Sequence, residues 1–196
     1  MQLKMMVAGL AMGVCSLAAN AQMGSAPAAP AGGSTEPAAA LQVMLGVLEH
    51  DIVPAAKAMP AEKYDFAPSA AAFAAGSPAK FETVRTFGEQ VAHVAQANYF
   101  FYMTLSGLKP DADVRAMGKM TKKEDAVKAL EGSIAFAHKA IATITAANAF
   151  ETIKGADGMN TRATLAAFGV AHGYDHYGQM VEYLRMNGII PPSSAK

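Results

Sequence analysis

The sequence predicts an all-α protein, a four-helix bundle of the up-down type with a longer crossover connection. Four stretches of about 20 to 27 residues repeat their apolar side chains at spacings of three and four, the period of one helix face. No segment alternates apolar and polar residues convincingly with period two, so no strand is predicted. At 196 residues, the chain is long enough to bury a core without disulfides or a structural metal.

The first 36 residues are predicted to lie outside the folded domain. Residues 1–21 join one Lys to a short apolar run and end in Ala-Asn-Ala, a pattern typical of a secretory signal peptide. The apolar run of about 15 residues is shorter than the ~20 that span a bilayer, so a retained membrane anchor is the weaker alternative. Residues 22–36 are mostly Ala, Pro, Gly and Ser and are predicted to form a flexible linker. We therefore expect an exported protein, located in the periplasm or secreted.

The composition excludes several classes of function. Signal cleavage would remove Cys15, the single cysteine, and with it any thiol nucleophile or disulfide. Sixteen basic residues balance sixteen acidic ones, so the chain lacks the excess of positive charge that is typical of proteins that bind nucleic acid. No hydrophobic run of spanning length is recognised after the linker, and no membrane contact is expected once the signal peptide is cleaved.

The first helix is predicted over about residues 37–59. Thr35 or Glu36 can cap it, and Pro54 should kink its last turns. Its apolar stripe consists of Leu41, Leu45, Leu48, Ile52 and Ala56. Residues 60–85 follow as a long loop, which buried aromatic side chains should pin to the domain. These aromatic residues are Tyr64, Phe66, Phe73 and Phe81.

The other three helices have start or stop signals. Two Thr-x-x-Glu sequences, at residues 86–89 and 121–124, have capping-box spacing and open the second and third predicted helices. The seam of the third helix consists of Val127, Leu130, Ile134, Ala137, Ile141 and Ile144. The fourth helix opens near Asn160 or Thr161 and ends at Gly188. The folded domain is therefore predicted over residues 37–192, with residues 193–196 as a C-terminal tail.

Two histidines of the fourth helix are the main candidates for chemistry. His172 and His176 are four residues apart, so their imidazoles lie one above the other on one helix face. They fall on the predicted core stripe, which consists of Leu165, Phe168, His172, His176, Gln179 and Tyr183. Two interior imidazoles indicate either a hydrogen-bonded core network or a shared metal ion. Gly173 stands where the zinc-protease motif requires Glu, which disfavours a hydrolase of that type.

The periodicity leaves the third ligand of such a site open. His93 on the second helix and His138 on the third both lie off the centre of their apolar stripes. Taken alone, each is better explained as a residue at the boundary between core and surface than as a metal ligand.

Three segments of the sequence carry a family resemblance. They are residues 86–95, which contain His93, residues 172–192, which begin with HGYDH and end with IIPP, and residues 63–68 after the first helix. On these segments the sequence resembles the DinB superfamily, over about residues 37–192. The resemblance implies a four-helix bundle with a divalent metal ion held by His93, His172 and His176. Zinc is the first expectation for this ion, with nickel or iron as alternatives.

The resemblance also implies a class of function. Family members with known activity are often thiol-dependent transferases, so we expect a metal-dependent thiol S-transferase or hydrolase that acts on a small molecule. The alternative is a non-catalytic bundle that binds a metal or a small ligand. Asp175, Gln179 and Tyr183 are candidates for side chains that support the ligands or line the cavity. Whether the chain forms a homodimer stays open.

Overall fold

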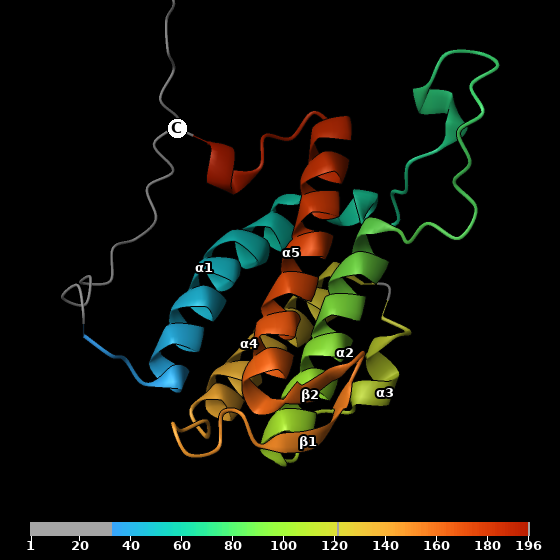
Figure 1. Cartoon of the computed structure of the whole chain (residues 1–196). Helices are drawn as coiled ribbons and strands as arrows, with labels where there is room; N and C mark the ends of the chain where they lie inside the picture. The colour runs from blue at the N-terminus through green and yellow to red at the C-terminus, as the bar shows by residue number, and fades with distance from the viewer. Residues whose placement is uncertain (1–32, 121, 196) are drawn as a thin grey trace, which may run out of the picture.

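The computed structural model describes residues 33–120 and 122–195. In this part of the chain, four long helices form a bundle (Figure 1). They are α1 (Pro37–Ala58), α2 (Phe87–Ser106), α4 (Lys123–Ile141) and α5 (Arg162–Met186). The all-α prediction is confirmed. The predicted signal peptide and residues 22–32 of the linker lie outside the described residues, whereas residues 33–36 are exposed and have no regular structure.

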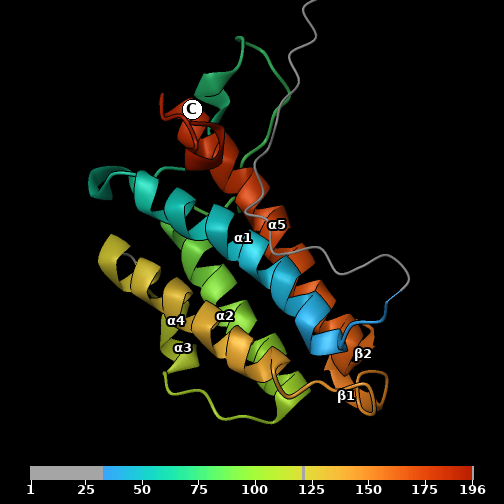
Figure 2. The same ribbon diagram turned by 90° about the vertical axis from the view of Figure 1, so that its left-hand side faces the viewer.

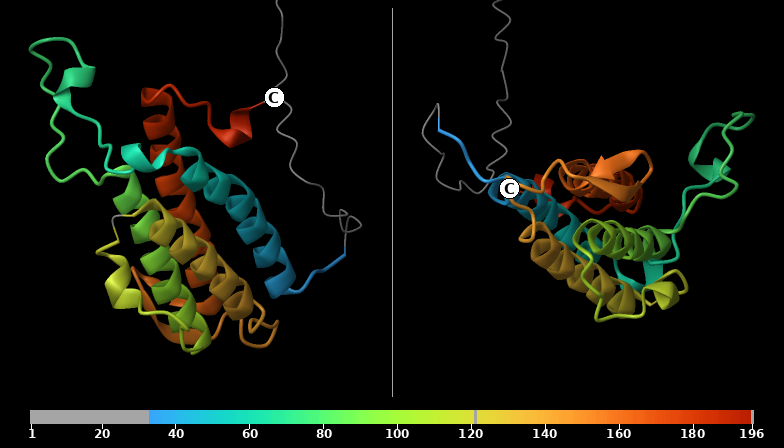
Figure 3. Two further views of the ribbon diagram at one scale, coloured as in Figure 1. Left: turned by 180° about the vertical axis from the view of Figure 1, so that it is seen from behind. Right: turned by 60° about the horizontal axis from the view of Figure 1, so that its bottom comes forward.

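The four helices pack in a ring. Helix α1 contacts α4 and α5, and α2 contacts the same two helices, so α1 lies diagonally opposite α2. Helices α1 and α5 run in one direction, and α2 and α4 run in the other (Figures 1 and 2). The connection between the parallel helices α2 and α4 must therefore return along the bundle. Residues 107–120 lie in this crossover beside α2 and include the short helix α3 (Val114–Met117), as Figure 3 shows from behind.

The predicted apolar stripes make the core of the bundle. All five stripe residues of the first helix are buried, and so are the six seam residues from Val127 to Ile144. Helix α1 corrects the prediction that no run of spanning length follows the linker, because it is apolar and long enough to cross a membrane by length and composition, with a mean hydropathy of 1.2. Its stripe nevertheless packs against α4 and α5, while Val43 and Met44 are exposed on its outer face.

Local capping sets where the helices begin. Helix α2 opens with the predicted capping box, in which the Glu89 N–H donates to Thr86 Oγ1 and the Thr86 N–H donates to Glu89 Oε2. Helix α5 opens with a similar reciprocal pair between Thr161 and Thr164. Helix α4 instead begins at Lys123, two residues after the predicted start at residue 121, which lies outside the described residues.

A short β-hairpin corrects the prediction that the chain has no strand. Strands β1 (Thr152–Ala156) and β2 (Met159–Thr161) pair antiparallel and contact α2 and α5. Asp157 and Gly158 join them with φ angles of 49° and 79°, as a tight turn of the Asp-Gly type requires. The strands are too short to show an alternating pattern, so the turn dipeptide is their one clear sequence signal.

The loop between α1 and α2 is held to the bundle near its ends, whereas its middle is not. The buried Tyr64 hydroxyl donates to the Ala56 carbonyl at 2.9 Å, and Phe66 meets the Tyr183 ring edge-on. The middle of the loop projects from the bundle in Figure 1. There Phe73 is half exposed and packs on Phe81. The prediction that all four aromatic residues are buried and pin the loop is therefore wrong for Phe73 and Phe81, which do not pack against the core.

Candidate metal centre

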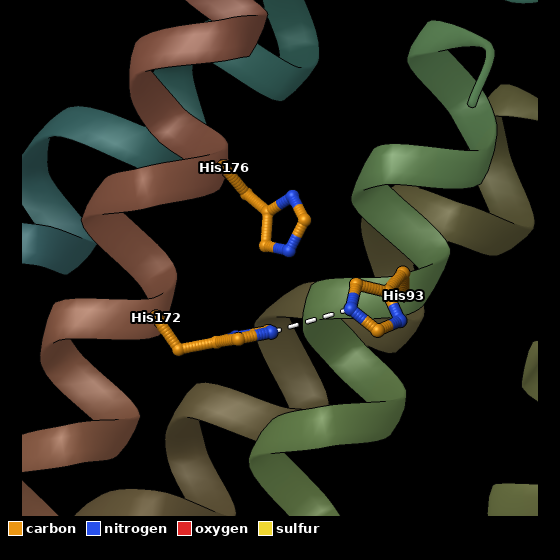
Figure 4. A group of neighbouring side chains, drawn as sticks. All are labelled: His93, His172 and His176. Atoms are coloured by element: carbon orange, nitrogen blue, oxygen red, sulfur yellow. Dashed lines mark hydrogen bonds between the residues drawn. The ribbon is translucent and has the colours of Figure 1, made fainter. Parts of the chain in front are cut away.

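Three histidines converge between α2 and α5. Helix α5 presents His172 and His176 one turn apart, and the antiparallel α2 places His93 opposite them (Figure 4). The Nε2 atoms of His93 and His172 lie 3.2 Å apart. One ligand nitrogen from each of the three histidines lies within 4.8 Å of the others. The structure thus brings together the three residues that the family resemblance selected.

The spacing of these nitrogens fits a tetrahedral metal ion. An ion with nitrogen ligands at 2.0–2.1 Å separates them from one another by about 3.3 Å. His93 and His172 are already at this separation. The nitrogen of His176 needs a movement of at most about 1.5 Å to join them, which a side-chain rotation supplies. Three imidazoles form a donor set that suits zinc, nickel, copper or iron.

Burial keeps the three imidazoles neutral. It lowers the pKa of His93 to about 4, with smaller effects from the charge of Arg85 and from His172. It also lowers the pKa of His176 to about 4, with help from the other two histidines. The pKa of His172 is lowered for the same main reason, although Asp175 opposes the shift. Neutral imidazoles have the lone pair that a metal ion needs, so at neutral pH no proton competes for the site.

A chain of side-chain amides orients His176. The Nδ1–H of His176 donates to Gln90 Oε1, and Gln90 Nε2 donates to Gln179 Oε1 at 2.7 Å. Gln179 Nε2 in turn donates to the Asp175 carboxylate at 3.1 Å. Because the carboxylate can only accept, it fixes the direction of every hydrogen bond in the chain. The Nε2 of His176 is left free and points toward the other two rings (Figure 4).

Two cavities lie beside the histidine cluster: His93 lines both of them, and His172 lines the larger one. One, of about 400 Å³, has a polar rim and is lined by Thr83, Val84, Arg85, Glu89, Ala92, His93, Gln96 and Gly118. The other, of about 560 Å³, is mainly apolar and is lined by Ala97, Phe100, Phe101, Met103, Val114, Arg115 and Asp157, together with His93, Gln96 and His172. A small molecule can therefore reach the imidazoles, as a reactive centre requires.

A comparison with protein families identifies this architecture. The DinB superfamily profile matches residues 22–180, which include α1, α2, α4 and all three converging histidines. The chain belongs to the DinB superfamily. The resemblance that the sequence motifs indicated is thereby confirmed. A comparison with the curated proteins gives no match.

Gln90 is the supporting residue that sequence reasoning missed in this DinB-superfamily chain. It is 2% exposed and lies three residues before His93 on the face of α2 that meets α5. A glutamine between the buried Phe87 and Val91 is a buried polar group, which needs hydrogen-bond partners. That signal was present in the sequence. Its partner, however, is 86 residues away and follows only from the pairing of the helices.

The three supporting candidates have different positions. Gln179 and Asp175 continue the amide chain from His176. The Tyr183 hydroxyl donates to the Arg85 carbonyl at 3.1 Å and makes no hydrogen bond to a histidine among the described residues. Tyr183 therefore anchors the end of the long loop beside the site.

The buried face of α5 differs from the predicted stripe. His176 and Tyr183 are buried, but His172 and Gln179 are half-buried at the edge of the face. Gly173 lies at the closest approach to α1, where an added Cβ would stand 2.4 Å from Leu48 Cδ2. This close packing gives a physical reason for glycine at the position where the zinc-protease motif has Glu.

His138, the other candidate for third ligand, lies outside the cluster. Its Nε2 is 2.9 Å from Glu49 Oε2, and its Nδ1 faces the Gln42 side chain. Gln42 Nε2 also donates to the His138 carbonyl, so this histidine ties α4 to α1. Its half-buried position agrees with the boundary between core and surface that the helix periodicity predicted.

Proposed function

We propose that this protein binds one divalent metal ion, zinc in the first place, through His93, His172 and His176, with nickel or iron as alternatives. We further propose that it uses the site as a thiol S-transferase or hydrolase on a small molecule, after export and signal cleavage. The observation that carries the proposal is the convergence of three neutral imidazoles, of which His93 lines both cavities and His172 lines the larger one.

The donor set supports catalysis rather than a purely structural ion. Structural zinc sites are closed by four protein ligands, whereas catalytic sites have three and keep one position open. Among the described residues, no fourth histidine, cysteine or carboxylate joins the group. A metal ion bound there would lower the pKa of a thiol or of water, which supplies a nucleophile at neutral pH.

The protein's own residues prepare the site. The hydrogen bond from His176 to Gln90 fixes the tautomer in which Nε2 is the available donor. Phe101 meets the His172 ring edge-on, with ring centroids 5.4 Å apart, and limits its movement. The two cavities then admit a substrate on either side of the ligand nitrogens.

Metal analysis of the processed chain, residues 22–196, tests the proposal first. We expect about one ion per chain in the wild type and loss of that ion in His172→Ala. His138→Ala is the matched control, because it removes a half-buried histidine outside the cluster and should retain the metal. Absence of metal from the wild type after reconstitution with zinc, nickel or iron would overturn the proposal.

Turnover separates catalysis from binding. The metal-loaded protein should transfer thiols to electrophilic acceptors or hydrolyse small substrates, and His172→Ala should lose that activity while it remains folded. A bound ion with no turnover in the thiol-transfer assays and in the hydrolysis assays would favour the non-catalytic alternative. In that alternative the same histidines hold a metal for ligand binding only.

A further inference from the structure

We infer that the substrate is an amphipathic anion, with an apolar, preferably aromatic, body in the 560 Å³ cavity and an anionic group beside Arg85 in the 400 Å³ cavity. This inference rests on the proposed function, because it places the reacting atom of the substrate between the two cavities, at the histidines.

The larger cavity is built for an apolar group. Ala97, Phe100, Phe101, Met103 and Val114 contribute most of its apolar wall. Phe100 is 46% exposed although it is a large apolar side chain on a long helix of the bundle. Its ring packs on that of Phe101 at 5.8 Å, so the two rings offer a contact surface for a planar apolar group. The volume is within the range of small-molecule sites.

Arg85 gives the smaller cavity its charge. It forms no ion pair within the described residues, where ion pairs involve other side chains. Its charge helps to lower the pKa of all three histidines, so the guanidinium lies close enough to act on the site. The one acid on this cavity wall is Glu89, and its carboxylate already accepts the Thr86 N–H of the helix cap.

Arg85 places a positive charge beside His93 on the wall of the smaller cavity. Each cavity wall contains one charge of each sign, Arg85 and Glu89 in the smaller cavity and Arg115 and Asp157 in the larger one. The Glu89 carboxylate is already engaged at the start of α2, so the anionic group of the substrate lies beside Arg85. A carboxylate, phosphate or sulfonate would find an available bidentate donor at Arg85.

The two cavities share part of their walls, so an elongated molecule that extends from one into the other passes the shared residues. His93 and Gln96 belong to the walls of both cavities. Gln96 Nε2 donates to the Val114 carbonyl at 2.9 Å, which holds this side chain against the crossover. A ligand that passes from the Phe100 surface to Arg85 therefore crosses in front of His93.

Binding of a homologous series of probes tests this inference. The probes are ω-phenyl carboxylates from phenylacetate to 6-phenylhexanoate, each paired with its neutral amide. Titration calorimetry is carried out on metal-free and zinc-loaded protein, residues 22–196, which include every described residue. We expect at least one carboxylate to bind about tenfold more tightly than its amide in both forms.

Variants assign the two ends of the probe. Arg85→Gln should remove the preference for the carboxylate, while Phe100→Ala should weaken carboxylate and amide alike. Arg185→Gln, at an exposed position of α5 outside both cavity walls, is the matched control and should keep the preference. Equal affinity for acid and amide in the wild type, no binding by any probe, or an unchanged preference in Arg85→Gln would overturn the inference.

The same samples distinguish this failure from failure of the proposed function. Metal content measured on them decides the proposed function by itself. If the protein binds zinc but shows no preference for the carboxylate, the metal site is supported and the anion site is wrong. If the protein binds no metal but shows a carboxylate preference that depends on Arg85, the anion site is supported and the proposed metal chemistry is wrong.

Discussion

Gln90 decides which nitrogen of His176 is available to a metal ion. Its amide is buried and is held by Gln179 on the far side, so it presents Oε1 to the imidazole. Gln90→Leu keeps a side chain of similar length but removes the acceptor, and the tautomer is no longer fixed. We expect zinc affinity to fall about 10- to 100-fold, measured by competition with a chelator of known affinity.

Gln96→Leu is the matched control for this substitution. Gln96 lies on the same helix and on the walls of both cavities, but its amide donates to the Val114 carbonyl and not to a histidine. It should keep zinc affinity within about twofold of the wild type, since it leaves the ligand orientation unchanged. Equal losses in the two variants would show that the amide chain does not orient His176.

The lowered pKa values predict that acid destabilises the metal-free protein. The unfolded chain takes up protons on its histidines near pH 6.5, whereas folded His93 and His176 take them up near pH 4. The stability that these residues contribute is therefore present above pH 6.5 and is lost as pH falls toward 4. Urea unfolding of metal-free protein at pH 7, 5.5 and 4 measures the loss.

A double variant isolates the histidines from the carboxylates that also titrate near pH 4. His93→Gln with His176→Gln should show a shallower decrease in unfolding free energy between pH 7 and 4 than the wild type. Identical pH profiles would mean that burial of these imidazoles does not lower their pKa.

At the scale of the element, Gly173 sets how closely α5 approaches α1. Leu48 is 1% exposed, so its Cδ2 has little room to move away from an added methyl group 2.4 Å distant. Gly173→Ala should lower the free energy of unfolding by about 1–3 kcal/mol through overpacking, despite the better helix propensity of Ala. Urea denaturation measures the change.

Gly178 gives the matching control on the same helix. An added Cβ there has no neighbour within 4 Å, so Gly178→Ala should stabilise α5 by up to about 1 kcal/mol. Leu48→Ala should cost less stability in a Gly173→Ala background than in the wild type, because the new methyl group fills part of the space that Leu48 vacates. Stabilisation by Gly173→Ala alone would contradict the close packing.

At the scale of the whole molecule, the sequence predicted those features that depend on the spacing of residues within one helix. The stripes from Leu41 to Ile52 and from Val127 to Ile144 are buried because one amphipathic helix needs one apolar face, whatever partner it finds. The His172–His176 pair is likewise local. The third ligand is not encoded locally, because His93 faces α5 only as a result of α1 and α2 lying diagonally opposite in the bundle. Periodicity alone could not choose it over His138.

Other features depend on contacts that one stretch of sequence does not contain. The 86-residue separation of Gln90 and His176 hides their hydrogen bond from any local pattern. The hairpin after α4 is short and packs against α2 and α5. It therefore depends on its turn dipeptide and on these contacts more than on the strand propensity of its residues. The loop aromatics show the same limit, because apolar character did not distinguish the buried Tyr64 from the exposed Phe73.

A metal ion at the three histidines would join α2 to α5, two antiparallel helices whose ligands His93 and His172 are 79 residues apart in the sequence (Figure 4). A ligand that binds only the native state stabilises it by mass action, by about 2.7 kcal/mol at 100 times Kd. For a domain of this size, each kcal/mol corresponds to about 2–4 °C in Tm, so saturating zinc should raise Tm by about 5–10 °C.

Calorimetry of the wild type with chelator and with zinc measures this shift, and His172→Ala should not respond to either. A hydrogen-bonded core network without metal makes the opposite prediction, because its stability comes from bonds such as that of His176 to Gln90 and needs no ion. In that case chelator and zinc would leave the wild-type Tm unchanged. The size of the zinc response therefore decides between the two explanations for two imidazoles on the interior face of α5.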